Sequence, residues 1–170
     1  MRKLNIRNIT LIALISSCFM QIGGQFFALS VLVRTIAEAP PRSFAILGGE
    51  YPYDSSGFWS TVPPVTAVLF NVALIANWKT QRRLFLLVAL ALFVFGGLIA
   101  GIVLEPEFAK MVAIGYSDSV DPKLQSRAAH WYYLDWATWG IGAMSGLMLL
   151  LALARPDEPK DARRPNGTAE

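Results

Sequence analysis

The run LFLLVALALFVFGGLIAGIVL, residues 84–104, decides the fold because its 21 residues include no charge. Arg82 and Arg83 precede it, and Glu105 and Glu107 follow it. As a helix it would be about 31 Å long, which matches a hydrocarbon core of roughly 30 Å. Unpaired backbone amides are too costly in lipid for a lone segment to cross in any other form. The run is therefore predicted to cross a membrane as a helix.

Three more long apolar segments predict three more spans, at about residues 9–33, 61–78 and 136–154. We expect an all-α, integral membrane four-helix bundle over residues 1–155. Residues 156–170 lack apolar side chains that could anchor a core, so a disordered cytoplasmic tail is predicted. Asp121-Pro122 is typical of a helix start, which predicts that the last helix begins well before its apolar part. Pro63 and Pro64 are expected in the first turn of the second helix.

Composition and charge agree with a membrane protein. The chain is 54% hydrophobic and 16% charged, with a mean hydropathy of +0.44. Ten of its 15 Lys and Arg fall on the two termini and the 79–83 turn, which by the positive-inside rule places both termini in the cytoplasm and the two longer loops outside. We expect a multi-pass cell-membrane protein. Nucleic-acid binding is excluded because the basic residues flank the apolar segments instead of clustering.

Cysteine and histidine counts limit the chemistry. Cys18 is the only cysteine, so an intramolecular disulfide, a Cys-x-x-Cys pair and a thiolate zinc site are excluded. His130 is the only histidine, which excludes a two-histidine metal site. A metal held by His130 with Glu105 and Glu107 would have no recognisable spacing. We expect no metal and no cofactor.

Residues 34–60 combine turn-forming residues with aromatic ones and predict an ordered outer loop. Two interpretations stay open. The aromatic side chains form a belt at the lipid headgroups, or the loop is a lid over a pocket between the helices.

Small residues at four-residue spacing predict where helices approach closely. They occur at Gly24-x-x-x-Ala28, Gly97-x-x-x-Gly101 and Gly142-x-x-x-Gly146. Polar residues at membrane depth are expected to face inward, because they are expensive in lipid. Gln21, Gln25 and Asn71 are such residues, either as interhelical hydrogen-bonding groups or as the polar floor of a ligand cavity.

Asp135 is the candidate catalytic residue. Helical spacing places it on one stripe with Trp131, Thr138 and Gly142, so it should face a neighbouring helix if Gly142 does. Its partner would be Arg127, two turns earlier, or a donor from the face of Gln21 and Gln25. An exposed Asp135 at the membrane interface is the alternative.

Three stretches carry a family resemblance: IGG-x-FFALSVL in the first span, VLEPEF after the third, and Trp131-x-x-x-Asp135-Trp136 before the fourth. With these, the chain resembles the anthrone oxygenase-like family of small four-helix membrane proteins over nearly its whole length. That family usually has Asn or His where Asp135 stands, and Arg near the place of Thr138. The resemblance implies oxidation of a hydrophobic phenolic or polycyclic compound without a tightly bound cofactor.

Two functions follow as hypotheses. In the first, Asp135 accepts a proton from a phenol, Gln21, Gln25 and Asn71 orient it, and the apolar walls are Trp131, Trp136 and Trp139. In the second, the bundle is not an enzyme and binds a membrane lipid or a partner subunit through its outer loops. A cavity reaching Asp135 and Gln25 would favour the first, and a closed bundle with exposed aromatics the second. The sequence is compatible with a homo-oligomer.

Overall fold

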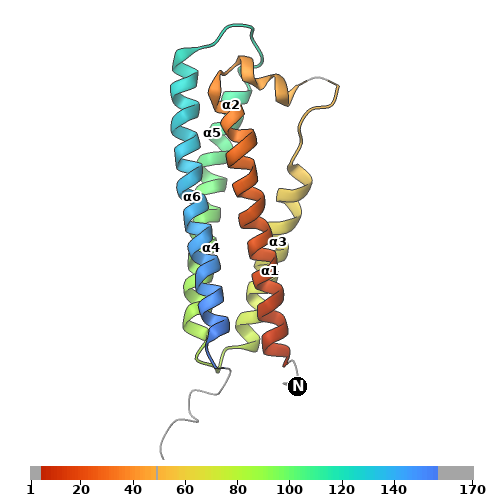
Figure 1. Ribbon diagram of the computed structural model, residues 1–170, viewed down its shortest axis with the longest axis vertical. Helices are drawn as coiled ribbons and strands as arrows, with labels where there is room; N and C mark the ends of the chain where they lie inside the picture. Colours follow the sequence, from red (N-terminus) through yellow and green to blue (C-terminus); the bar gives the residue numbers. More distant parts are fainter. Residues whose placement is uncertain (1–4, 49, 157–170) are drawn as a thin grey trace, which may run out of the picture.

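The computed structural model describes residues 5–48 and 50–156 of the chain, and these form a tall bundle of helices (Figure 1). Within these ranges the protein is all-helical, and four helices are long and apolar enough to cross a membrane. The predicted fold class is therefore confirmed, and the chain is an integral membrane protein. Most of the predicted disordered tail, residues 157–170, lies outside the described residues.

We call each of the four helices that are long enough to cross a membrane a rod. Two of these rods consist of consecutive helical segments. The first joins α1 (Ile6–Phe27), a π-helical turn η1 (Ala28–Val33) and α2 (Arg34–Glu38). The third joins α4 (Arg83–Ile99), a π-helical turn η3 (Ala100–Leu104) and α5 (Glu105–Val112). The other two are α3 (Ser56–Ala76) and α6 (Pro122–Ala154), and a short 3-10 helix η2 (Arg42–Leu47) lies in the first outer loop.

Three of the four rods in the described part of the chain are longer than the hydrocarbon core of a bilayer is thick. The first and the last each contain 33 residues, which is about 50 Å of helix against a hydrocarbon core of roughly 30 Å. These rods therefore have length to spare beyond a hydrocarbon core, and α2 and α5 lie together at one end of the bundle, which we call the outer end after the predicted orientation (Figure 1).

Aspartate side chains accept hydrogen bonds from backbone amides at two of the helix starts. Asp121 accepts hydrogen bonds from the backbone amides of Lys123 (2.8 Å) and Leu124 (3.4 Å), as the predicted helix start requires. Asp54 likewise accepts from the backbone amide of Ser56 at 2.8 Å, and α3 begins there.

The early start of α3 places its two prolines away from the first turn. The expectation that Pro63 and Pro64 lie in the first turn is therefore wrong. Both lie inside the helix, and membrane helices tolerate such residues because neighbouring groups satisfy the freed carbonyls.

Two separate apolar cores hold the bundle together. α6 packs along α4 and α1, and α1 packs along α3. The inner core lies among these four helices and consists of Leu11, Leu14, Cys18, Phe70, Ala73, Leu86, Ala89, Leu149 and Ala152. The outer core joins the first outer loop to α5 and α6 and consists of Ile36, Phe44, Met111, Leu124 and Ala128.

The small-residue motifs do not all mark helix contacts. A Cβ atom at Gly146 would lie 2.9 Å from Ile22 Cδ1, so this glycine does allow close packing. Gly97 and Gly101 are exposed, and a Cβ atom at either would meet nothing within 4 Å, so the predicted contact there is wrong. The neighbouring Gly96 is the buried one, facing Ile141 and Thr138. Hydropathy cannot show which of these glycines faces a neighbouring helix, because every residue of that run is apolar or small.

The described ends of the chain meet at one end of the bundle (Figure 1). There the buried Arg82 side chain donates to Asn8 Oδ1 (2.6 Å) and to the backbone oxygen of Arg155 (2.9 Å). Asn77 donates to the backbone oxygen of Arg7 at 3.4 Å. The turn between α3 and α4 therefore ties the first helix to the last. We call this the basic end.

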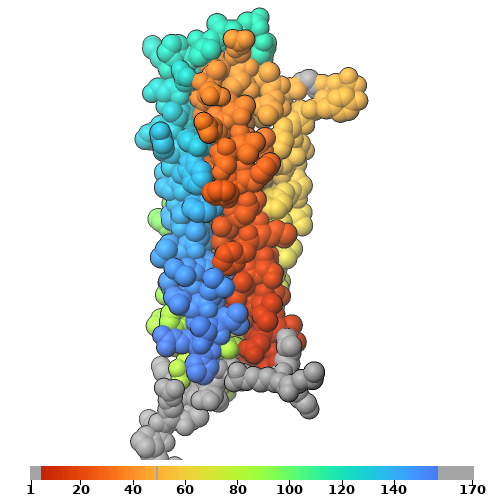
Figure 2. All heavy atoms as spheres, in the orientation of Figure 1, coloured from red at the N-terminus to blue at the C-terminus, as the bar shows by residue number. Residues whose placement is uncertain are grey.

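The described part of the first outer loop, residues 34–48 and 50–60, is ordered, as predicted. The amide of Asp121 donates to the oxygen of Pro40 (3.0 Å), and Gln125 Nε2 donates to the oxygen of Glu38 (2.6 Å). Part of this loop projects sideways from the column (Figure 2). Tyr51 of the loop is 88% exposed.

Candidate functional site

Asp135 and Gln25 form a hydrogen bond between the first and last helices. Gln25 Nε2 donates to Asp135 Oδ1 at 2.9 Å, and both residues are half-buried. The prediction that Asp135 faces a neighbouring helix and meets the face of Gln25 is therefore confirmed. Its other suggested partner, Arg127, instead pairs with Glu107 of α5.

Aromatic residues next to this pair in the sequence pack together on the seam between α1 and α6. Trp136 and Trp139 contact each other edge-on, with centroids 5.5 Å apart, and both contact Phe26. Trp139 Nε1 donates to the oxygen of Ile22 at 3.1 Å. Through these contacts the two tryptophans of α6 pack against α1.

Trp131 packs on the third rod. Its Nε1 donates to the oxygen of Leu104 at 2.9 Å, and its ring stacks on Phe108 with centroids 5.0 Å apart. Leu104 ends the π-helical turn η3, where the regular hydrogen-bond pattern is interrupted and carbonyl oxygens need other donors. Trp131 therefore stabilises a local irregularity of the third rod.

The remaining predicted polar residues behave differently from one another. Asn71 is exposed and its amide donates to the oxygen of Ala67 in its own helix at 2.8 Å, so the prediction that it faces inward is wrong. This internal bond explains how an amide can face lipid, because it satisfies the donor locally. Gln21 is half-buried, and its Oε1 is buried without a partner among the described residues.

Ser17 and Thr66 are polar groups that the sequence did not single out. They are buried, and their hydroxyl oxygens lie 2.7 Å apart between α1 and α3. Thr66 also donates to the oxygen of Val62 at 2.8 Å, so Ser17 supplies the proton of the bond between them. Their small size and moderate polarity give no signal in a hydropathy pattern.

No metal-binding group is present in the part of the chain that the structure describes: no three His, Cys, Asp or Glu side chains gather there. His130 is exposed, and Glu107 is engaged with Arg127.

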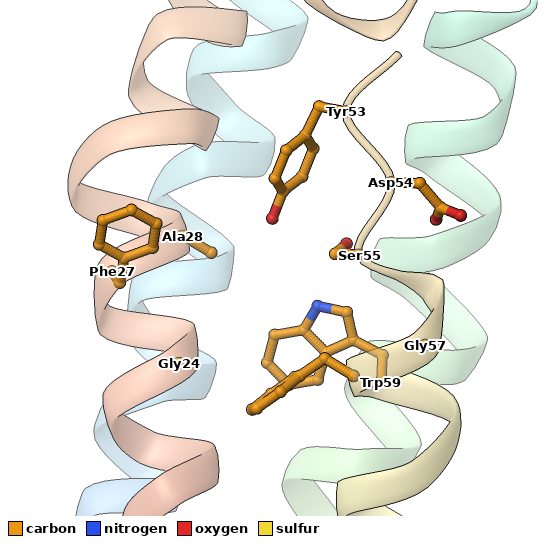
Figure 3. A pocket seen from close by; sticks show the side chains of 9 residues that line it. Gly24, Phe27, Ala28, Tyr53, Asp54, Ser55, Gly57 and Trp59 are labelled. Carbon is orange, nitrogen blue, oxygen red and sulfur yellow. The ribbon is translucent and has the colours of Figure 1, made fainter. Parts of the chain in front are cut away.

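A partly open pocket of about 310 Å³ lies between the first rod and the start of α3 (Figure 3). Its walls are mainly apolar and aromatic. The lining residues are Gly24, Phe27, Ala28, Tyr53, Asp54, Ser55, Gly57, Phe58 and Trp59. The volume falls at the lower end of the range found for small-molecule sites. One wall of the pocket therefore consists of the end of the first outer loop, residues 53–55, and the first turn of α3.

Three polar groups in this lining have no partner among the described residues: the Tyr53 and Ser55 hydroxyls and the Trp59 indole N–H. The Tyr53 hydroxyl points into the space between the helices, towards Ser55 and Trp59 (Figure 3). Each of the three can donate a hydrogen bond, and indole N–H can only donate. The pocket therefore offers several free donors above an apolar floor.

Asp54 supplies no free charge to the pocket interior. Its carboxylate accepts from the amide and the hydroxyl of Ser56, at 2.8 and 3.0 Å, and points away from Tyr53 (Figure 3). The pKa of Asp54 lies below its ordinary value of 3.8, first because of the bond from the Ser56 amide and then because of the Ser56 hydroxyl. Its role is to hold the start of α3 in place.

Gly24 makes the pocket possible at its lower edge. A Cβ atom at this position would lie 2.6 Å from Phe58 Cζ, so only glycine lets the Phe58 ring pack directly on α1. The predicted motif at Gly24 therefore does mark a close approach, but to a side chain of α3.

The pocket and the Asp135 pair are different sites. Gly24 and Ala28 line the pocket, whereas Gln25 extends to α6, and neither Gln25 nor Asp135 is among the lining residues. None of the predicted binding residues, Gln21, Gln25, Asn71, Trp131, Trp136 and Trp139, lines it either. The one signal in the sequence is the density of aromatic residues over 51–59, which also suits an interfacial belt.

Comparisons with known proteins supply no relative. The chain matches no family model, no curated protein and no solved structure.

Proposed function

We propose that this membrane protein binds a small, flat, hydrophobic molecule with hydrogen-bond-accepting oxygens in the pocket between α1 and α3. A phenolic or polycyclic compound has this chemistry. The observation that carries the proposal is the set of three unpartnered donors, on Tyr53, Ser55 and Trp59, beside an apolar wall. Apolar pockets with a few convergent polar groups are typical of small-molecule sites.

The charges of the residues that line the pocket restrict the class of ligand further. The lining contains no Lys, Arg or His, and its single acidic residue, Asp54, is held in its ionised form by Ser56. An anionic ligand would meet no counter-charge there. We therefore expect a neutral compound.

The proposal is binding without a chemical step. The geometry favours this because the candidate proton acceptor, Asp135, is bonded to Gln25 and does not line the pocket. Oxidation of the bound compound stays an expectation of the family resemblance.

Binding can be tested with 2-naphthol, using naphthalene as the matched compound without oxygen and the full chain in lipid nanodiscs. Tyr53→Phe and Trp59→Phe each remove one donor and keep an aromatic ring. We expect each to weaken 2-naphthol binding about two- to tenfold, the usual worth of one hydrogen bond. Tyr51→Phe is the control, because Tyr51 is 88% exposed and outside the lining.

Two results would contradict the proposal. One is equal affinity for 2-naphthol and naphthalene in the unaltered protein. The other is an equal effect of Tyr51→Phe and Tyr53→Phe, which would mean that the pocket hydroxyl contributes nothing specific.

A further inference from the structure

The basic end of the bundle carries three exposed cations, Lys79, Arg83 and Arg155. Among the described residues, none of the three side chains forms an ion pair or a hydrogen bond. The described residues that build this end, 5–15, 74–90 and 148–156, include no Asp or Glu. Positive charge is therefore concentrated here without a carboxylate from the same described segments.

Two of these cations lie over aromatic rings. The Arg83 guanidinium carbon is 4.9 Å from the centre of the Trp78 ring, and that of Arg155 is 5.2 Å from the centre of the Phe85 ring. A guanidinium that makes a cation–π contact still has N–H groups along its edge that can donate hydrogen bonds. Those edges match a phosphate group, which an arginine can bind through two parallel hydrogen bonds.

The positions of Arg83 and Arg155 along their helices indicate how deep these side chains lie in the membrane. Arg83 immediately precedes the charge-free run of α4, and Arg155 immediately follows the last helical residue of α6. Both therefore lie where the apolar part of the bundle ends, together with the half-exposed Trp78. Tryptophan and arginine at such a boundary lie at the level of lipid headgroups.

From this charge, these ring contacts and this depth we propose that Lys79, Arg83 and Arg155 bind phosphate groups of anionic phospholipids in the leaflet at the basic end. A headgroup with net negative charge suits the surface better than a zwitterionic one, whose own cation competes for the phosphate. The site is on the opposite end of the bundle from the proposed ligand pocket, so either proposal can fail without the other.

The neighbouring Arg82 is a structural residue, and it guides the choice of variants. It is buried and binds Asn8 and the backbone oxygen of Arg155, so it should be left in place. Arg83→Gln and Arg155→Gln remove charge from exposed side chains, and Arg155→Gln keeps the backbone oxygen that Arg82 needs. Arg42→Gln and Lys123→Gln, at the outer end, form a matched control with the same loss of charge.

The test is to titrate full-length protein in neutral detergent with phosphatidylglycerol or phosphatidylcholine and to count bound lipid by native mass spectrometry. We expect tighter binding of phosphatidylglycerol. Each arginine substitution should weaken it about fivefold, the worth of one basic residue near an anionic surface, and the double variant about 25-fold. The outer control should bind as the unaltered protein does.

Inorganic phosphate in place of lipid separates a headgroup site from a site for the free ion. The proposal requires that phosphate at the same concentration does not displace phosphatidylglycerol. It is overturned if phosphate displaces the lipid, if both lipids bind equally, or if the outer control loses as much binding as the arginine variants. Circular dichroism checks that each variant keeps its helices, and a variant that loses them is replaced by Lys79→Gln.

Discussion

Gln25 of α1 and Asp135 of α6 lie 110 positions apart in the sequence and share a hydrogen bond of 2.9 Å. The bond joins the first membrane helix to the last, and both side chains are half-buried. Both groups therefore depend on each other for a partner, and the pair contributes to the docking of α6 on α1.

Replacement of Asp135 separates a structural role from a catalytic one. Asn keeps an accepting oxygen, so Asp135→Asn should leave the free energy of unfolding in detergent nearly unchanged. Asp135→Leu should lower it by about 1 kcal/mol, because Gln25 loses its partner. In Asp135→Leu with Gln25→Leu, part of the loss should return. A large loss in Asp135→Asn would show that the charge itself is needed.

Ser17 and Asn71 should differ in their importance although both are polar residues of membrane helices. Ser17→Ala removes a buried bond to Thr66 and should lower the free energy of unfolding by about 0.6–1.7 kcal/mol. Asn71→Ala removes only a bond within its own helix, from an exposed position, and should cost less than about 0.5 kcal/mol. Denaturant titration of both variants measures the difference, and the reverse order would mean that Asn71 has a partner in the membrane.

Gly24 controls the size of the pocket. In Gly24→Ala the new Cβ must displace the Phe58 ring, which is 2.6 Å away, so ligand binding should weaken by about tenfold or more, while the helices stay folded. Gly23→Ala is the matched control, since nothing lies within 4 Å of a Cβ there. The two variants can be compared by 2-naphthol titration, and equal affinities would exclude Phe58 from the site.

The start of α3 should depend on pH through Asp54. Because the folded protein lowers the pKa of this carboxyl, the ionised form stabilises the fold, and this contribution is complete at neutral pH. As the pH falls below the ordinary value of 3.8 and through the lowered pKa, the contribution is lost. Trp59 fluorescence should report loosening in that acid range, and Asp54→Ala should remove the transition. A transition centred well above that range would point to another group.

The positions of the membrane-spanning helices could be predicted from the sequence, but the face that each helix turns to its neighbours could not. The charge-free run 84–104 and the Asp121-Pro122 start are local features, and both correspond to the structure. Which face of a helix is buried depends on its neighbours, so Gly96 is buried instead of Gly97 and Asn71 is exposed. Gln25 could be identified because a bond to Asp135 needs only two polar groups on facing helices. The pocket combines Gly24 with residues 53–59, and this contact across a loop has no periodic signature.

The depth of the pocket along the first rod determines the route by which a ligand can reach it. Gly24 lies about 27 Å of helix beyond Ile6, close to the outer edge of a hydrocarbon layer of roughly 30 Å. A hydrophobic compound that dissolves in the bilayer can thus arrive by lateral diffusion within the leaflet, without passing through water. Occupancy should then follow the mole fraction of compound in the lipid, and a large excess of added lipid at constant total compound should empty the site.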